Sequence, residues 1–368
     1  MPRLRLAVLF GGRSGEHEIS LLSARSVLGA LDREKYEVIQ VGITHAGDWL
    51  SGDDVLASFE RGEVDKLTPV AIQAQPGQAG LFGRGEAGSW VPITELDLAF
   101  PVLHGTFGED GTIQGLFELA ELPYVGAGVL ASAVAMDKGL FKELMQARGL
   151  PVLESLVLNT TELETDLEGA LDRAEAVAGY PLFVKPANLG SSVGISKVRS
   201  RSDLLEGLME AAQYDRRVLV ERGVEGREIE VSVLGNEEPE ASLPGEVIPS
   251  DEFYSYRAKY LDGRSELIIP APIDEETAEE ARRIAIEAYR AIDGAGMARV
   301  DLLLAKENGR LYLNEINTIP GFTRISMYPK LWEASGVPYP ELMDRLIELG
   351  LARHAQKQKL VRSYEGAA

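Results

Sequence analysis

Residues 181–198 read PLFVKPANLGSSVGISKV, and the order of elements in this stretch decides how the fold is interpreted. An apolar run ends in Lys185, a Gly/Ser turn follows, and ISKV is typical of a second strand. A Walker-type phosphate loop would instead pass from a strand through glycines into a helix. Backbone N–H groups of a turn between strands can still hold phosphates when a lysine lies nearby. The stretch therefore predicts a phosphate-binding lid between two strands.

Composition narrows the classes of function. With 368 residues, the chain exceeds the usual size of a single core, so two or three domains are expected. Its formal net charge of -21 argues against nucleic acid and anionic membranes as partners. The absence of cysteine excludes disulfides, thiolate nucleophiles and Cys-ligated zinc. Any anionic ligand must therefore be held by a local cluster of cations.

The hydrophobic pattern predicts an open α/β sheet first, followed by two further units. The expected strands and helices of the first unit are 4–10, 20–31, 36–43, 96–103 and 112–121, with hairpins or loops outside the core over 51–92. The second unit starts near Tyr124 with a helix over 131–148 and contains the opening stretch. The third has strands over 218–221 and 228–234, a helix over 275–292 and a hairpin over 299–317. The predicted domains are 1–123, 124–216 and 217–352, with a polar tail over 353–368.

The strongest chemical signal is ARVDLLLAKENGRLYLNEINTIPG, residues 298–321. Two apolar strands flank a Glu-Asn-Gly turn, which predicts a hairpin that brings Asp301 close to Glu315. Period-two alternation places Glu315 and Asn317 on one face. Two carboxylates and an amide oxygen suit Mg²⁺ that also binds substrate phosphates. Alternatively, the carboxylates form structural ion pairs with Arg299 or Arg310.

Two short segments match the residue pattern of a known motif but lack the flanking secondary structure that the motif requires. GAGVLA, residues 126–131, fits a dinucleotide fingerprint, but it follows a very short strand and no acidic strand end follows it. GSSVG, residues 190–194, fits the hydrolase elbow, which needs a strand-to-helix turn, so Ser192 is not an expected nucleophile. The four histidines, His17, His45, His104 and His354, show no metal-ligand spacing.

The motifs VKPANLGSSVG and VLVERGVEGREIEV, with RVD followed by NEIN, together resemble the ATP-grasp superfamily. GGRSGEHEIS, HGTFGEDGTIQG and DEFYSYRAKY narrow the resemblance to the D-alanine:D-alanine ligases, from Leu4 to about residue 350. This resemblance implies a mixed α/β, three-domain ATP-grasp fold, in which two domains sandwich ATP beside an N-terminal open α/β domain. It also implies ATP-dependent ligation of two D-alanines through an acyl phosphate, for peptidoglycan precursor synthesis.

The resemblance further implies which residues bind ATP and metal. The nucleotide-binding set is Lys138, Phe183, Lys185, Ser191, Ser192, Glu221, Arg222, Val224, Glu228, Lys259, Asn314 and Glu315. In this set, the segment from Glu221 to Val224 binds adenine, Glu228 binds ribose, and the three lysines bind phosphates. The family often has lysine where Arg222 stands. Two Mg²⁺ or Mn²⁺ ions would be held by Asp301, Glu315 and Asn317.

Substrate and catalytic residues follow from the same resemblance. The substrate-binding set is Glu16, His104, Tyr260, Arg299, Gly321, Ser326 and Met327, and the catalytic set is Glu16, Ser191, Tyr260, Arg299, Gly321 and Ser326. Glu16, Ser191 and Tyr260 would position the first substrate's ammonium group. Arg299 and the Gly321 N–H would donate to an oxyanion, and Ser326 and Met327 would receive the second carboxylate. By its position alone, Glu16 could equally cap a helix.

Alternative functions remain open from the sequence. One is ligation of D-alanine to D-lactate or D-serine, although RAKY with Tyr260 resembles the D-alanine type. The other is a nucleotide-binding sensor of the same fold without turnover. The resemblance also implies a cytoplasmic homodimer, and neither nucleic acid nor membrane is expected as a partner.

Overall fold

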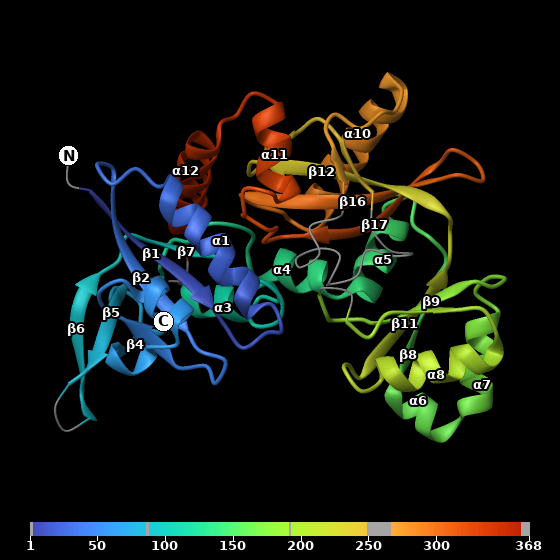
Figure 1. Ribbon diagram of the computed structural model, residues 1–368, viewed down its shortest axis with the longest axis horizontal. Coiled ribbons are helices and arrows are strands. Elements are labelled where there is room, and N and C mark those ends of the chain that lie inside the picture. The colour runs from blue at the N-terminus through green and yellow to red at the C-terminus, as the bar shows by residue number, and fades with distance from the viewer. Residues whose placement is uncertain (1–2, 86–87, 191–192, 249–265, 362–368) are drawn as a thin grey trace, which may run out of the picture.

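The computed structural model describes residues 3–85, 88–190, 193–248 and 266–361, which form three β-sheets flanked by helices (Figure 1). The first sheet has the strand order β6-β5-β4-β3-β2-β1-β7. Its strands are β1 (Leu4–Gly11), β2 (Tyr36–Ile43), β3 (Trp49–Ser51), β4 (Thr68–Ile72), β5 (Gly80–Arg84), β6 (Trp90–Glu95) and β7 (Leu98–Pro101). Its helices are α1 (His17–Ala30), α2 (Val55–Arg61), the 3₁₀ turn η1 (Val64–Lys66) and α3 (Thr112–Leu119).

The predicted open α/β unit is confirmed at the centre of this sheet. Strand β1 pairs in parallel with both β2 and β7, and the loops that follow β1 and β7 therefore meet at one edge. β1 ends at Gly11, where φ is 87° and a Cβ would lie 2.3 Å from the Ile43 carbonyl oxygen. Only glycine fits this turn, which leads the chain to the start of α1.

The segment 51–92 differs from the prediction. It forms hairpins, but these extend the first sheet in antiparallel fashion and contribute to its core. Val70, Ile72 and Leu81 are buried together with Leu9 of β1. The polar and glycine-rich composition conceals these strands, because a strand with one solvent-facing side needs an apolar residue only at alternate positions.

The second sheet has the order β10-β9-β11-β8, with every neighbouring pair antiparallel. Its elements are β8 (Ser155–Asn159), α6 (Thr160–Thr165), α7 (Leu167–Glu175), β9 (Leu182–Pro186), β10 (Ser196–Val198), α8 (Arg201–Ala211) and β11 (Arg217–Arg222). The pairing of β9 with β10 confirms that a strand follows the Gly/Ser turn. Strand β11 lies in this sheet, whereas the sequence pattern grouped 218–221 with the third unit. The chain changes sheets at 223–225.

The third sheet has the order β15-β14-β12-β16-β17, with β13 beside β12. Its elements are β12 (Gly226–Leu234), β13 (Glu240–Ala241), β14 (Gly245–Ile248), β15 (Glu266–Ile268), α10 (Glu275–Ala291), β16 (Met297–Ala305) and β17 (Leu311–Asn317). Helix α10 packs Ile284 and Ala288 against Ile229 and Val300 on one face of the sheet. The predicted helix and hairpin are both confirmed, and the opposite face of the sheet carries the polar residues.

The predicted helix over 131–148 is two helices, α4 (Val129–Met136) and α5 (Lys138–Ala147). The break is at Asp137, whose backbone is extended and whose carboxylate accepts a hydrogen bond from the Leu140 N–H at 2.9 Å. Asp137 therefore caps α5 and begins a new helix direction. As a result, Lys138 occupies the first turn of α5.

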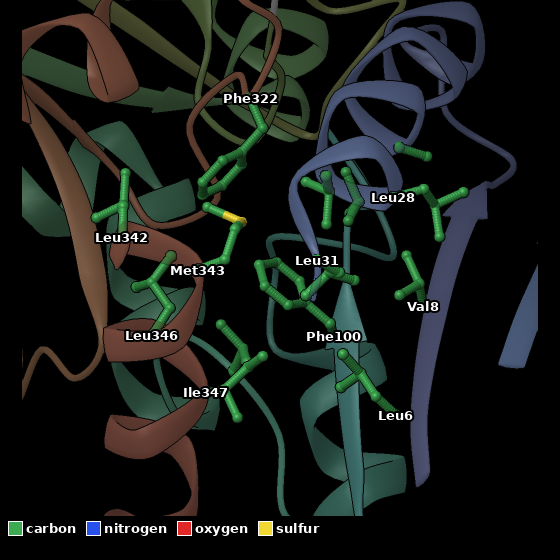
Figure 2. Close-up of a cluster of buried hydrophobic side chains, with 14 of the residues drawn as sticks. Leu6, Val8, Leu28, Leu31, Phe100, Phe322, Leu342, Met343, Leu346 and Ile347 are labelled. Atoms are coloured by element: carbon green, nitrogen blue, oxygen red, sulfur yellow. The ribbon is translucent and has the colours of Figure 1, made fainter. Parts of the chain in front are cut away.

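The C-terminal part of the chain returns to the N-terminal sheet. It consists of α11 (Met327–Ala334) and α12 (Tyr339–Gln358), so the predicted polar tail is helical from 353 to 358. Figure 2 shows Met343 and Leu346 of α12 facing Phe100 and Leu31 of the N-terminal unit. Within the described ranges, no helix combines the length and the apolar character needed to cross a membrane.

Candidate active site

One small cavity collects charged residues from all three units. Its volume is about 50 Å³, and its lining includes Glu16, Glu109, Lys138, Gly190, Arg299, Glu315 and Asn317. A larger cavity of about 700 Å³ lies against β3 to β6 and is lined by Trp49, Arg84 and Trp90 among others. We assign the site to the smaller cavity, because it holds the carboxylates and cations that phosphate chemistry requires.

The hairpin of β16 and β17 positions the acidic side chains. Asp301 lies opposite Glu315 in the register, and the pairing then shifts so that Leu302 lies opposite Leu313 and Asn314 is an extra residue on β17. Leu313 and Ile316 both face the core under α10, so the intervening Asn314 and Glu315 lie on the polar face. The bulge thus adds Asn314 to the face that alternation alone assigns to Glu315.

Arg299 is held between two carboxylates. It makes two hydrogen bonds to Asp301, at 2.7 and 2.6 Å, and its Nε lies 3.1 Å from Glu230 Oε2. The ion pair with Arg299 that the sequence left open for Asp301 is therefore formed. Sequence reasoning missed Glu230, although it alternates with Glu228 on β12 and so lies on the same face.

A divalent cation can be tested against the donor atoms. Among residues 3–85, 88–190, 193–248 and 266–361, no group of three or more His, Cys, Asp or Glu is arranged to hold a metal. Asp301, Glu315 and Asn317 instead offer two carboxylates and an amide on one face. Mg²⁺ is commonly bound by one or two carboxylates with substrate phosphates completing its shell. The residues therefore fit a cation that arrives with a nucleotide.

Two buried lysines share the carboxylate of Glu221. Lys185 pairs with Glu221 Oε1, and Lys142 Nζ lies 2.9 Å from Glu221 Oε2. Burial raises the pKa of the Glu221 carboxyl, but the two lysines lower it more strongly, to about 2. Burial lowers the pKa of Lys185, but Glu221 raises it above its ordinary value. Glu221 and Lys185 are therefore both charged at neutral pH.

Lys138 connects α5 to the other site segments. Its Nζ donates to the Leu189 carbonyl at 2.8 Å, and it lies 3.5 Å from Glu315 Oε2. Its backbone N–H donates to the Ala187 carbonyl at 3.0 Å. The start of α5 thus holds the segment that precedes the Gly/Ser turn and faces the acidic hairpin.

Glu16 lies where the first and second units meet. A Cβ on Gly105 would lie 2.5 Å from Glu16 Oε2, and one on Gly190 would lie 2.9 Å from the same oxygen. Glu16 is the N-cap residue of α1, but its side chain makes no cap hydrogen bond. The carboxylate is therefore directed between two glycine-containing loops rather than at its own helix.

His104 is buried at the junction of the first and third units. Its Nε2 lies 2.8 Å from Ser23 Oγ, and its Nδ1 lies 3.0 Å from the Ile319 carbonyl and 3.6 Å from Glu109 Oε1. Burial lowers the pKa of His104, but Glu109 raises it above the ordinary value. Burial raises the pKa of Glu109 to about 7, against the lowering effect of His104. Glu109 was missed by sequence reasoning, although it lies in the same HGTFGED motif.

The loop before α11 holds the remaining third-unit positions. A Cβ on Gly321 would lie 2.8 Å from Ser326 Oγ, which also accepts a hydrogen bond from the Thr323 N–H at 3.0 Å. Met327 is buried against Val247. Its predicted role in binding a carboxylate would therefore depend on its backbone at the start of α11.

The predicted adenine-binding segment, Glu221 to Val224, lies at the end of β11, where the chain leaves the second sheet. Arg222 lies 2.9 Å from Glu154 and 3.3 Å from Glu307, and so connects the second and third sheets. Phe183 is opposite Glu221 in the register, and Val224 packs near Tyr312. Glu228 lies opposite Leu303 at the start of β12. Four predicted site residues, Ser191, Ser192, Lys259 and Tyr260, lie outside the described residues.

Comparison with known proteins covers almost the whole chain. Family models described as the D-ala D-ala ligase N-terminus and C-terminus match residues 5–127 and 144–348. A D-alanine–D-alanine ligase of Thermoanaerobacter sp. is 53% identical over 97% of this chain and 99% of its own length. That of Heliobacterium modesticaldum is 51% identical over 98% of both.

Solved structures of the same family are similar to this chain over almost its whole length. The D-alanine-D-alanine ligase from Coxiella burnetii has a TM-score of 0.85, with 40% identity over 99% of both chains. This confirms the predicted mixed α/β ATP-grasp fold. The VanG D-Ala:D-Ser ligase from Enterococcus faecalis has a TM-score of 0.85 and 35% identity over 95% of this chain and all of its own. On these findings, the chain belongs to the D-alanine–D-alanine ligase family.

Proposed function

We propose that this protein joins two D-alanine molecules with hydrolysis of ATP, and so forms D-alanyl-D-alanine for peptidoglycan synthesis. Its full-length relatives at about 50% identity are D-alanine–D-alanine ligases. The observation that carries the mechanism is the acidic hairpin: Asp301 lies opposite Glu315 in the register, and Glu315 and Lys138 face each other in one cavity. This cavity brings carboxylates suited to a metal together with a cation suited to phosphate, the combination that a nucleoside triphosphate requires.

The first chemical step is phosphoryl transfer. A carboxylate oxygen of the first D-alanine attacks the γ-phosphorus of ATP, the bond to the β,γ-bridging oxygen breaks, and an acyl phosphate and ADP result. This step depends on positioning and charge neutralisation rather than on a protein nucleophile. Lys138 and Lys185 supply positive charge, and Glu16 holds the substrate ammonium group. A bound Mg²⁺ on Asp301, Glu315 and Asn317 would neutralise further phosphate charge.

The second step forms the peptide bond. The free amine of the second D-alanine attacks the acyl carbon, the tetrahedral oxyanion collapses, and phosphate leaves. Arg299 is suited to stabilise that oxyanion, because Asp301 and Glu230 fix its guanidinium in place before the reaction. The Gly321 N–H is the second proposed donor, and Ser326, beside it, is placed to receive the second carboxylate.

The acceptor could instead be D-serine, as in the Enterococcus faecalis relative, or D-lactate. The overall fold does not separate these activities, since that relative superposes as well as the Coxiella burnetii ligase. D-alanine is favoured because relatives with 45 to 53% identity are D-alanine–D-alanine ligases. We also propose that the protein acts in the cytoplasm as a homodimer, with two Mg²⁺ or Mn²⁺ ions bound together with ATP.

A screen of ADP release over D- and L-amino acids tests this function. We expect release to rise with D-alanine and the dipeptide to be detected by mass spectrometry. Release with D-alanine plus D-serine or D-lactate, but not with D-alanine alone, would identify the other ligases. No release with any amino acid would favour a nucleotide sensor. Glu315→Gln is the control for the metal assignment, and equal activity in that variant would remove it.

A further inference from the structure

Lys142 is a buried cation to which the proposed reaction assigns no role. It lies on α5, one helical turn beyond Lys138, and only 2% of the residue is exposed. Its ion pair within the described part of the chain is with Glu221 Oε2, at 2.9 Å. Lysine is rarely buried to this extent unless it is paired, because desolvation of an ammonium group is costly. The position therefore requires an explanation.

The second lysine on the same carboxylate supplies that explanation. Lys185 pairs with the other oxygen of Glu221, so both carboxylate oxygens are occupied by lysines. Lys185 is the penultimate residue of β9, just before the segment that leads to Gly190 in the site cavity. With Glu221 alone, Lys185 would be neutralised by its partner. With Lys142 present, the three groups carry a net charge of plus one.

We infer that Lys142 is a positioning residue that lets Glu221 anchor Lys185 without cancelling its charge toward the nucleotide phosphates. Glu221 holds the Lys185 ammonium group in one place, and Lys142 offsets the negative charge that this requires. The inference rests on the proposed function for the identity of the ligand.

In this inference Lys142 changes the net charge of the cluster that it forms with Glu221 and Lys185. Its effect on affinity must therefore be larger for a ligand with more negative charge. The test is calorimetric titration of the full chain with ATP and with adenosine, for the wild type and for Lys142→Met, Lys142→Arg and Lys142→Met/Glu221→Gln. In Lys142→Met we expect ATP to bind about tenfold more weakly, a difference of about 1.4 kcal/mol, with adenosine unchanged. Lys142→Arg should retain most of the ATP affinity.

The double variant separates charge from packing. Removing the Glu221 charge together with that of Lys142 restores the net charge of plus one, so ATP affinity should recover most of the loss. Equal weakening of ATP and adenosine, an unchanged ATP affinity in Lys142→Met, or no recovery in the double variant would each overturn the inference. If Lys142→Met does not fold, Glu221→Gln replaces it, and that variant must then raise the ratio of ATP to adenosine affinity.

The titration contains no amino acid, so its outcome is independent of the reaction. If the wild-type protein binds ATP but releases no ADP with D-alanine, the proposed function is contradicted. The titration of the variants with ATP and adenosine still decides the inference in that case. Conversely, normal ligation with ATP affinity that does not respond to Lys142→Met would overturn the inference alone. KM for ATP, measured beside kcat, gives a second readout in which Lys142→Met should change mainly KM.

Discussion

Arg299 combines a structural and a chemical property in one side chain. Its bidentate contact with Asp301 and its contact with Glu230 fix the plane of the guanidinium. A donor that is already oriented needs no reorganisation when negative charge develops on the reacting carbonyl. The ion pair with Asp301 and the proposed oxyanion role therefore support each other.

Arg299→Ala should lower kcat by about 100- to 1000-fold, because one preorganised oxyanion donor is lost. It should also lower stability, since the truncation takes one partner from Asp301 and one from the buried carboxylate of Glu230. Steady-state ADP release, measured at a temperature where the variant is folded, checks the first effect. Arg310→Ala, an exposed residue of the same hairpin, is the control. Turnover equal to wild type in Arg299→Ala would contradict the assignment.

The pair of Glu109 and His104 predicts a pH dependence of stability. Burial raises the pKa of Glu109 to about 7, from an ordinary value near 4.5, so the folded state binds the proton more tightly than the unfolded state. This contribution is full below about pH 4.5 and is lost as pH rises through about 7. The free energy of unfolding should therefore fall by about 1–3 kcal/mol over that range.

Glu109→Gln should make the free energy of unfolding depend less on pH between about 4.5 and 7. Urea unfolding at a series of pH values between 4.5 and 7.5 is the measurement, and Glu143→Gln, an exposed carboxyl on α5, is the matched control. A Glu109→Gln protein with the wild-type slope would show that another group causes the dependence. His104, whose pKa is also raised, contributes in the same direction.

Single residues of the site were predictable where the local pattern makes them exceptional. A lysine at the end of an apolar run and two acidic residues in an apolar hairpin stand out from sequence alone. Lys142, Glu109 and Glu230 do not, because each resembles a solvated charge until the tertiary contacts bury it. The spacing of Lys142 four residues after Lys138 was a usable signal, since both then lie on one helix face.

At the scale of elements, the connection between β9 and β10 lies close to the first unit. A Cβ on Gly190 would lie 2.9 Å from Glu16 Oε2, and a methyl group there must displace the carboxylate. Because the atoms met belong to the end of a flexible side chain, the carboxylate can move aside at little cost in stability, but it then leaves its position in the site. Gly190→Ala should therefore raise KM for D-alanine about ten- to 100-fold, with little change in the melting temperature.

Gly179→Ala is the matched control for this change, because a Cβ there meets no atom within 4 Å. Initial rates over a range of D-alanine concentrations check the prediction in both proteins. An unchanged KM in Gly190→Ala would mean that Glu16 does not hold the substrate ammonium group.

The strands and helices were largely predictable, but their grouping was not. The hydrophobic pattern predicted β11 as a strand but grouped it with the third unit, because the same alternation suits either neighbouring sheet. The break between α4 and α5 was missed because apolar and helix-favouring residues continue across it. The Asp137 carboxylate decides the break, and aspartate before a helix is a cap signal that the longer pattern conceals.

At the scale of the whole molecule, one core joins the two ends of the chain. Met343, Leu346 and Ile347 of α12 are in the same buried cluster as Leu6 and Phe100 of the first sheet (Figure 2). Neither segment can bury its apolar face alone. The ATP-grasp architecture was predicted from the order of six motifs, whereas this packing of α12 has no motif and required the structure.

Leu346→Ala should therefore destabilise the protein by about 2–5 kcal/mol, as is usual when a fully buried leucine is truncated. Urea unfolding followed by tryptophan fluorescence measures the loss. Leu360→Ala is the control, since Leu360 is 66% exposed just beyond α12, and it should cost little. A loss below about 1 kcal/mol in Leu346→Ala would contradict a shared core.

The position of α12 also matters while the protein is being made. The first sheet leaves the ribosome early, but the residues that cover its apolar face are translated about 250 positions later. At about 5–20 residues per second, Phe100 waits roughly 10–50 s for these partners, and Leu6, which is made earlier, waits longer. The nascent chain must therefore pass through a stage in which chaperones can bind this face, and a prematurely terminated product would be left with a permanent aggregation site.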